Sequence, residues 1–151
     1  MSLIKRVLRK LKLLPNPVSH PVKRMDLKEI VICDNLSFLV YWKILAIGKG
    51  PAVILKAYNK EILKFDCFGE KDGHYHVAPN YGSRIYFLEK TVMEQVDRTV
   101  AELKINGLKY LSLQKEPEIR NLKPSHFDYN SAVDSVEKLL VHFHQTVEEI
   151  R

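Results

Sequence analysis

The sequence of 151 residues lacks the features that define several large protein classes. No apolar run reaches the ~18 residues that a membrane span needs, and the N-terminal segment alternates leucine with lysine and arginine where a signal peptide has an apolar core. There is no Walker-type loop, no dinucleotide glycine fingerprint, no nucleophile elbow and no zinc-finger spacing. We therefore expect a cytoplasmic protein, and the sequence names no cofactor.

Cysteine is scarce, and its two occurrences are far apart in the chain. Cys33 and Cys67 do not form a C-x-x-C pair, and each lies in an apolar, β-like run where cysteine acts as a small hydrophobic residue. We expect both thiols to be reduced and buried.

Acidic residues are absent before Asp26, whereas the same segment holds seven basic residues. The net charge of +6 therefore lies in this segment, and the rest of the chain is close to neutral. A basic segment on a nearly neutral body indicates an anionic partner, either nucleic acid or an acidic membrane surface. The residues expected to contact that partner are Lys5, Arg6, Arg9, Lys10, Lys12, Lys23 and Arg24.

The N-terminal segment also has helical periodicity. In residues 2–14 the aliphatic side chains share one helical face and the basic side chains share the other. The proline-rich stretch Pro15–Pro21 forbids continuation of this helix and predicts an extended linker. We divide the chain into an arm and linker, residues 1–24, and a single α+β domain, residues 25–151. Two interpretations fit the apolar face of the arm: it contacts a partner, or it packs on its own domain.

The central part of the chain has the character of β-strands. Six runs rich in Val, Ile, Tyr and Phe follow one another between Lys28 and Phe87: KEIVIC, SFLVYWKILAI, PAVILKAY, EILKFDCF, HYHV and RIYF. Turn signals separate most of them, at Asp34-Asn35, Gly48–Pro51, Asn59-Lys60 and Gly69–Gly73. Short strands joined by short turns predict an antiparallel meander of five or six strands.

After Phe87 the apolar spacing becomes helical. It predicts one helix with Val92, Val96, Val100 and Leu103 inward, ending near Asn106-Gly107. Residues 109–113 fit a further strand or extended chain, and residues 114–124 fit a loop. A last helix is expected to begin at Asn130 or Ser131 and to bury Val133, Val136, Leu140, Phe143 and Val147. The fold class is therefore α+β, a meander packed by two helices.

The densest polar cluster of the sequence is FDCFGEKDGHYHV. Alternation on a strand places His74 and His76 on one face, about 7 Å apart along the chain. Asp66 or Asp72, across the expected hairpin, could orient an imidazole or complete a ligand set. This arrangement suits general acid–base chemistry near neutral pH, with one histidine accepting a proton and the other donating one. The candidate catalytic residues are Asp66, His74 and His76.

Two other interpretations of this cluster remain open. An H-x-H run on a half-exposed edge strand can be a solvated face that buries only Tyr75. A metal site is the third interpretation, but the spacing supplies two histidine ligands and at least one more is needed. No metal is therefore predicted from the sequence.

At this hairpin the chain resembles the TumE-type family of toxin–antitoxin proteins, small α+β proteins with an Asp and a following H-x-H after a β meander. The matching residues are Phe65, Asp66, Gly73, His74 and His76, and Ala132–Ile150 is similar to the family's closing helix. The chain departs from the family at Cys67, where the family has Asn, and in the insertion 89–123. The resemblance implies a bacterial or archaeal cytoplasmic protein that acts against nucleic acid or translation and is neutralised by a cognate antitoxin.

Two hypotheses of different classes follow. In the first, the chain is a toxin-like component in which His74 and His76 transfer protons, Asp66 orients them and the basic arm holds phosphates. In the second, it is a non-catalytic adaptor whose basic helix contacts nucleic acid, a membrane surface or a protein. The sequence does not decide whether the chain is an enzyme.

Overall fold

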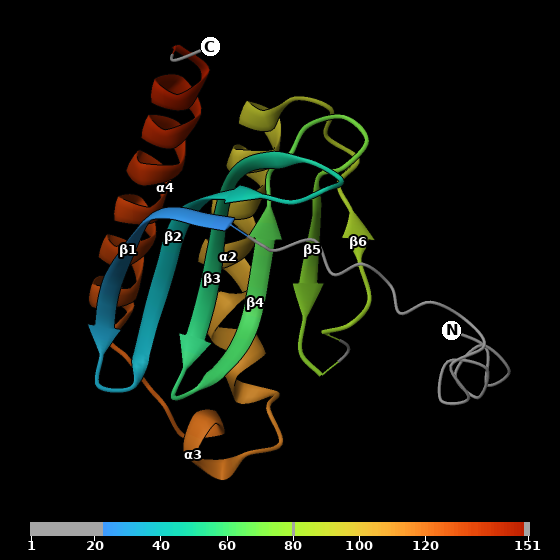
Figure 1. Ribbon diagram of the computed structural model, residues 1–151. Coiled ribbons are helices and arrows are strands. Elements are labelled where there is room, and N and C mark those ends of the chain that lie inside the picture. Colours follow the sequence, from blue (N-terminus) through green and yellow to red (C-terminus); the bar gives the residue numbers. More distant parts are fainter. Residues whose placement is uncertain (1–22, 80, 150–151) are drawn as a thin grey trace, which may run out of the picture.

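The computed structural model describes residues 23–79 and 81–149. Its centre is a six-stranded antiparallel sheet in the order β1-β2-β3-β4-β5-β6, shown in Figure 1. The strands are β1 Lys23–Cys33, β2 Leu36–Ile44, β3 Lys49–Ala57, β4 Lys60–Asp66, β5 His74–Val77 and β6 Ile85–Tyr86. The helices are α2 Val92–Ser112, α3 Pro117–Arg120 and α4 His126–Glu149. The predicted α+β meander is confirmed, and the predicted helix over residues 2–14 lies outside the described residues.

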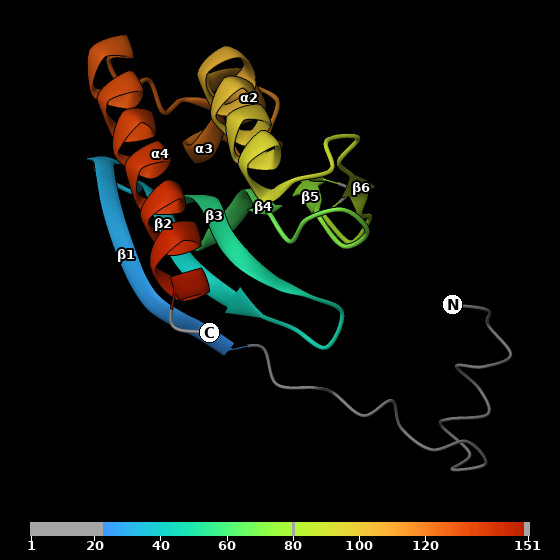
Figure 2. The same cartoon turned by 90° about the horizontal axis from the view of Figure 1, so that it is seen from above.

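Both long helices cover the same face of the sheet. Figure 2 shows α2 and α4 side by side on one side of the strands, and among residues 23–79 and 81–149 no helix lies on the other side. The main core lies between these helices and the inward side chains of alternate strand positions, such as Phe38, Val53 and Phe65. We call the two sides of the sheet the helix-covered face and the helix-free face.

The sheet is strongly curved toward its helix-free face. The first residues of β1 bend across this face, so that Arg24 forms an ion pair with Glu61 on β4 at 3.4 Å and lies 5.1 Å above the ring of Tyr41. Under this curvature Tyr41, Ala52 and Ile54 form a small second cluster of buried residues, separate from the main core. The helix-free face therefore has an interior of its own.

The strand boundaries differ from the predicted ones in two turns. The turn between β3 and β4 is Tyr58-Asn59, one residue earlier than expected. The Gly48–Pro51 segment is mostly strand, because β3 begins at Lys49 and the turn ends at Gly48. Gly50 is needed within β3, since a Cβ atom there would lie 2.2 Å from the carbonyl oxygen of Cys67.

The prediction for the first long helix is wrong at its end. Helix α2 starts with a capping box, in which Thr91 and Glu94 satisfy each other's backbone N–H groups. It then continues through Gly107 to Ser112, so residues 109–112 are helical and Leu113 is the C-cap residue. Gly107 serves close packing instead of helix termination, because a Cβ atom would lie 1.7 Å from Tyr129 Oη on α4.

The following segments also differ from the sequence-based expectation. The loop expected over residues 114–124 contains the short helix α3, held by the buried side chain of Ile119. Helix α4 begins at His126, four residues before Asn130, because Ser125 Oγ accepts a hydrogen bond from the backbone N–H of Asp128 at 3.0 Å. Its predicted inward residues Val133, Val136, Leu140 and Phe143 are buried.

Two further expectations have mixed outcomes. Cys67 is fully buried as predicted, whereas Cys33 is half-buried; both are free thiols. Over residues 23–79 and 81–149, no helix has an apolar stretch that would cross a bilayer.

Candidate functional site

One row of residues crosses five strands of the sheet on its helix-free face. The strand register places Tyr41 opposite Ala52, Ala52 opposite Asp66, Asp66 opposite His74, and His74 opposite Tyr86. Neighbouring strands are about 4.8 Å apart, and alternate residues point to the same face. The meander therefore brings together side chains that are widely separated in sequence.

Asp66 is the centre of this row and is fully buried. Its Oδ2 atom accepts a hydrogen bond from Lys43 Nζ at 2.7 Å and lies 3.3 Å from His74 Nε2. The side chain of Lys43 is only 4 % exposed. The second carboxylate oxygen, Oδ1, has no hydrogen-bond partner among the described residues. Asp66 thus has one neutralised oxygen and one with free lone pairs.

His74 and His76 are both oriented by backbone carbonyl groups. His74 Nδ1 lies 2.7 Å from Asp72 O, and His76 Nδ1 lies 2.7 Å from Tyr81 O. A carbonyl oxygen can only accept, so each Nδ1 carries the donated hydrogen, and the Nε2 atom of each neutral ring has a lone pair. One ligand atom from each of Asp66, His74 and His76 lies within 4.8 Å of the other two.

Burial governs the ionisation of the cluster. It lowers the pKa of His74 and of His76, which favours the neutral imidazoles, and the positive charge of Lys43 acts in the same direction on His74. Burial also lowers the pKa of Lys43, although the charge of Asp66 opposes this shift. Desolvation is therefore the largest contribution to the pKa shifts of His74, His76 and Lys43.

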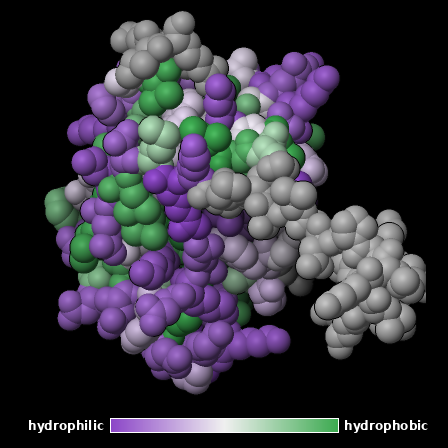
Figure 3. All heavy atoms as spheres, in the orientation of Figure 1, coloured by the Kyte–Doolittle hydropathy of each residue, from purple (hydrophilic) through white to green (hydrophobic). Residues whose placement is uncertain are grey.

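A second polar group borders the cluster and adds further cations. Tyr81 Oη donates a hydrogen bond to Glu61, and Lys64 Nζ lies 3.8 Å from Glu61 and 4.9 Å from the centre of the Tyr81 ring. Burial raises the pKa of Glu61, but the bond from Tyr81 and the charges of Lys64 and Arg24 outweigh it, so this carboxylate stays ionised. The helix-free face is predominantly hydrophilic where Figure 3 shows described residues.

The loop before His74 is fixed by a side chain from the other face. Gln95 on α2 accepts from Gly69 N at 3.0 Å and donates to Gly69 O at 2.9 Å. Gly73 lies against the same amide, since a Cβ atom there would be 2.2 Å from Gln95 Oε1. The core helix therefore sets the position at which β5 begins and at which His74 faces Asp66.

The structure brings Asp66, His74 and His76 together, as the sequence predicted. Asp72 contributes its backbone carbonyl to His74 and not its carboxylate. Lys23 and Arg24 belong to β1 instead of to the arm. The other predicted anion-binding residues, Lys5, Arg6, Arg9, Lys10 and Lys12, lie outside the described part of the chain.

Sequence reasoning missed Lys43 and Tyr41. Both lie in the run LSFLVYWKI, where a lysine within a buried strand was the available signal. Tyr41 Oη is buried and has no hydrogen-bond partner among residues 23–79 and 81–149. Its burial raises the pKa of Tyr41, and the negative charge of Asp66 adds to the shift.

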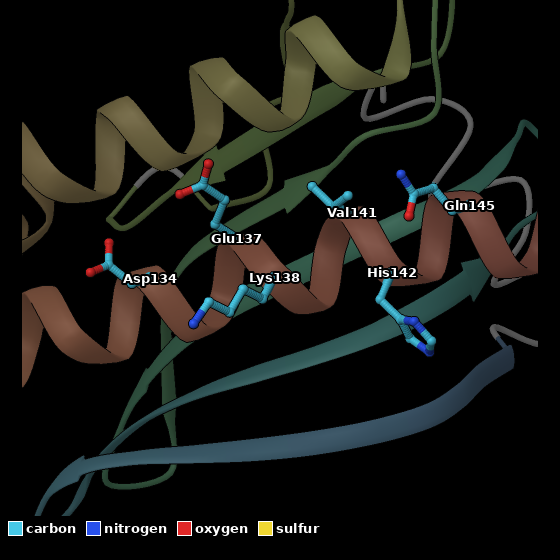
Figure 4. A pocket seen from close by; sticks show the side chains of 6 residues that line it. All are labelled: Asp134, Glu137, Lys138, Val141, His142 and Gln145. Atoms are coloured by element: carbon cyan, nitrogen blue, oxygen red, sulfur yellow. The ribbon is translucent and has the colours of Figure 1, made fainter.

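A separate hollow lies on the opposite side of the molecule. It is lined by six residues of α4 alone, Asp134, Glu137, Lys138, Val141, His142 and Gln145. Figure 4 shows these side chains extending outward from the helix, without convergence on a common point. This surface does not carry the chemistry of the Asp66 cluster.

Comparisons of the chain with protein-family models, with curated proteins and with solved structures found no match.

Proposed function

We propose that this chain acts on nucleic acid at the cluster of Asp66, His74 and His76, as a toxin-like component. The observation that carries the proposal is the convergence of three acceptor atoms within 4.8 Å at a site from which water is largely excluded. Buried polar groups that face one another without complete pairing are costly, and such groups concentrate at functional sites.

The charges around the cluster favour a polyanionic substrate. Lys43 contacts Asp66, Lys64 acts electrostatically on His76, and Arg84 acts on His74. These cations, together with Arg24, outnumber the carboxylates Asp66 and Glu61. A site with excess positive charge at low dielectric attracts and holds phosphate groups.

The chemistry that this arrangement supports is phosphodiester hydrolysis. A water oxygen adds to phosphorus, one phosphorus–oxygen bond to the leaving ribose breaks, and one proton of the water ends on the leaving oxygen. The acceptor atoms of the cluster favour a water molecule that loses its proton, and the ammonium group of Lys43 favours the charge that grows on the phosphoryl oxygens. The products are a phosphate monoester and a hydroxyl.

The partners in this proposal follow from the basic segment and from the resemblance to TumE-type proteins. Lys5, Arg6, Arg9, Lys10 and Lys12 contact further phosphates of the same nucleic acid. A cognate antitoxin neutralises the chain in the cytoplasm. The alternative is an adaptor that binds nucleic acid, a membrane surface or a protein without catalysis, favoured by the separation of the basic segment from a nearly neutral body.

The test compares cell growth and nucleic acid cleavage for three versions of the chain. Wild type should arrest growth on expression, and the purified protein should cleave RNA or single-stranded DNA. The variant His76→Ala should do neither, although its thermal unfolding matches wild type, because His76 is half-buried and outside the Lys43–Asp66 pair. His142→Ala, an exposed histidine on α4, is the matched control and should behave as wild type.

Two results would contradict the catalytic proposal. Equal activity of wild type and His76→Ala would remove the cluster from the mechanism. Binding of nucleic acid that is lost on deletion of residues 1–22 but unchanged in His76→Ala, with no cleavage by either protein, would favour the adaptor.

A further inference from the structure

The contact between Asp66 and His74 joins two atoms that can both ligate a metal ion, a carboxylate oxygen and an imidazole nitrogen. In the neutral form of the ring, the hydrogen is on Nδ1, where it is donated to Asp72 O, and the Nε2 atom then presents its lone pair to Asp66 Oδ2 at 3.3 Å. Two lone pairs at this distance in a buried site repel each other unless a positive charge lies between or beside them. Lys43 neutralises one side of the carboxylate, but it donates to Oδ2 and gives His74 Nε2 no partner.

The third acceptor converges on the same place. His76 Nε2 is left without the hydrogen, because His76 Nδ1 uses it on Tyr81 O, and the rings of His74 and His76 have their centres 5.0 Å apart. The free oxygen of Asp66, Oδ1, has no partner within residues 23–79 and 81–149. The described part of the cluster therefore offers lone pairs from three residues and no donor that satisfies them all.

The distances suit one metal ion. Two ligands on a tetrahedral zinc ion, with bonds of about 2.0–2.1 Å, are about 3.4 Å from each other. The Asp66–His74 contact of 3.3 Å already has this value, and all three ligand atoms lie within 4.8 Å.

The surroundings have the arrangement that supports metal ligands. Metal-binding histidines usually donate their second ring N–H to a carbonyl or carboxylate, and ligating carboxylates are themselves hydrogen-bonded. Both histidines here donate to backbone carbonyls, and Asp66 accepts from Lys43. The backbone partners fix which ring nitrogen faces the site.

We infer that Asp66, His74 and His76 bind one divalent transition metal ion of the zinc type. Two imidazoles and one carboxylate match Zn²⁺, Co²⁺ or Fe²⁺ better than Mg²⁺ or Ca²⁺, which prefer oxygen ligands alone. Three protein ligands leave a coordination position for water or a phosphoryl oxygen, as in catalytic zinc sites. Asp66 is thus the further ligand that the H-x-H spacing lacked.

This inference specifies how the cluster would activate water, through a bound ion in place of direct proton acceptance by a histidine. The catalytic use of the ion rests on the proposed function, whereas its binding does not. A binding measurement without nucleic acid therefore separates the two: metal binding without cleavage would contradict only the proposed function, and cleavage by a chain that binds no metal would contradict only this inference.

The test uses the full chain, purified without a histidine tag and stripped of metal. Titration calorimetry with Zn²⁺ should show one ion per chain, Co²⁺ should give the visible absorption of an imidazole-ligated site, and Zn²⁺ should raise the thermal unfolding temperature. His76→Ala and Asp66→Asn should weaken binding by more than the roughly 10–100-fold that loss of a supporting group costs. The cobalt absorption should disappear with them.

The control is the second H-x-H of the chain, His142-Phe143-His144 on α4. On a helix, residues two positions apart point to different sides, so these two histidines do not share a face. The variant His142→Ala should bind Zn²⁺ as wild type does. Should Asp66→Asn fail to fold, His76→Gln provides the second ligand variant, since His76 is half-buried. Wild type without saturable Zn²⁺ and Co²⁺ binding, or binding of equal strength in the His76 variants, would overturn the inference.

Discussion

The two faces of the sheet are equally buried near β4 but chemically opposite. Phe65 is 1 % exposed and stacks on Tyr75 within the helix-covered core, with the centres of the two rings 5.2 Å apart. The next residue, Asp66, is fully buried and meets Lys43 and His74. At this point of the sheet, apolar side chains fill the interior of one face, whereas a carboxylate, an ammonium group and an imidazole are buried together on the other.

The difference bears on the stability of the fold. The free energy needed to desolvate a buried ion pair is about as large as the attraction between its charges. An apolar pair of similar volume would therefore stabilise the fold equally well or better. Stability alone therefore does not require Lys43 and Asp66 on the helix-free face, and we expect their role to lie in the proposed function. Active sites commonly keep polar groups whose local cost is offset by the rest of the fold.

The largest expected effect belongs to the helix-covered face. In an open helix position Gly→Ala favours folding by up to about 1 kcal/mol. At Gly107 the sign should reverse, because the new Cβ would lie 1.7 Å from Tyr129 Oη and force α2 and α4 apart. We expect Gly107→Ala to lower the free energy of unfolding by about 1–3 kcal/mol, the usual cost of overpacking, in urea titrations.

The matched control for this change is Gly82→Ala. No heavy atom of the described residues lies within 4 Å of a Cβ at Gly82, so the free energy of unfolding should change by less than about 0.5 kcal/mol. Equal effects of the two substitutions would mean that the contact between Gly107 and Tyr129 does not organise the helix pair.

A smaller effect on the free energy of unfolding is expected when each of two buried tyrosines, Tyr129 and Tyr41, is replaced by phenylalanine. Tyr129 Oη donates to Leu103 O at 2.8 Å on the helix-covered face, whereas Tyr41 Oη on the helix-free face has no partner among the described residues. Tyr129→Phe should cost about 1 kcal/mol of unfolding free energy, and Tyr41→Phe should be neutral or slightly stabilising. A loss of similar size at Tyr41 would show that its hydroxyl is satisfied within the folded chain.

Short-range patterns were sufficient for the meander and for part of the site. The pairing of Asp66 with His74 follows from a hairpin whose turn is Gly69–Gly73, and the shared face of His74 and His76 follows from strand alternation. Lys43 was not accessible in this way. It is 23 residues from Asp66 and reaches it only through the combined register of β2, β3 and β4.

The errors in the helices have the same long-range origin. Asn106-Gly107 is a typical helix stop, but the approach of Tyr129 from α4 requires a glycine inside α2. The start of α4 was placed too late because Asn130 and Ser131 are good N-cap residues, while Ser125 caps the helix instead. Local propensity identified the right residue types and tertiary packing chose among them.

The most direct test of the contrast between the two faces replaces the buried ion pair with apolar residues. The double variant Lys43→Met/Asp66→Leu is unfolded in urea beside wild type, with a metal chelator in both samples. If the pair is kept for function, the variant should be as stable as wild type or more stable, by up to about 1–4 kcal/mol, and should have lost Zn²⁺ binding and cleavage. A clear loss of unfolding free energy in the double variant would contradict this account and make the cluster a structural element of the sheet.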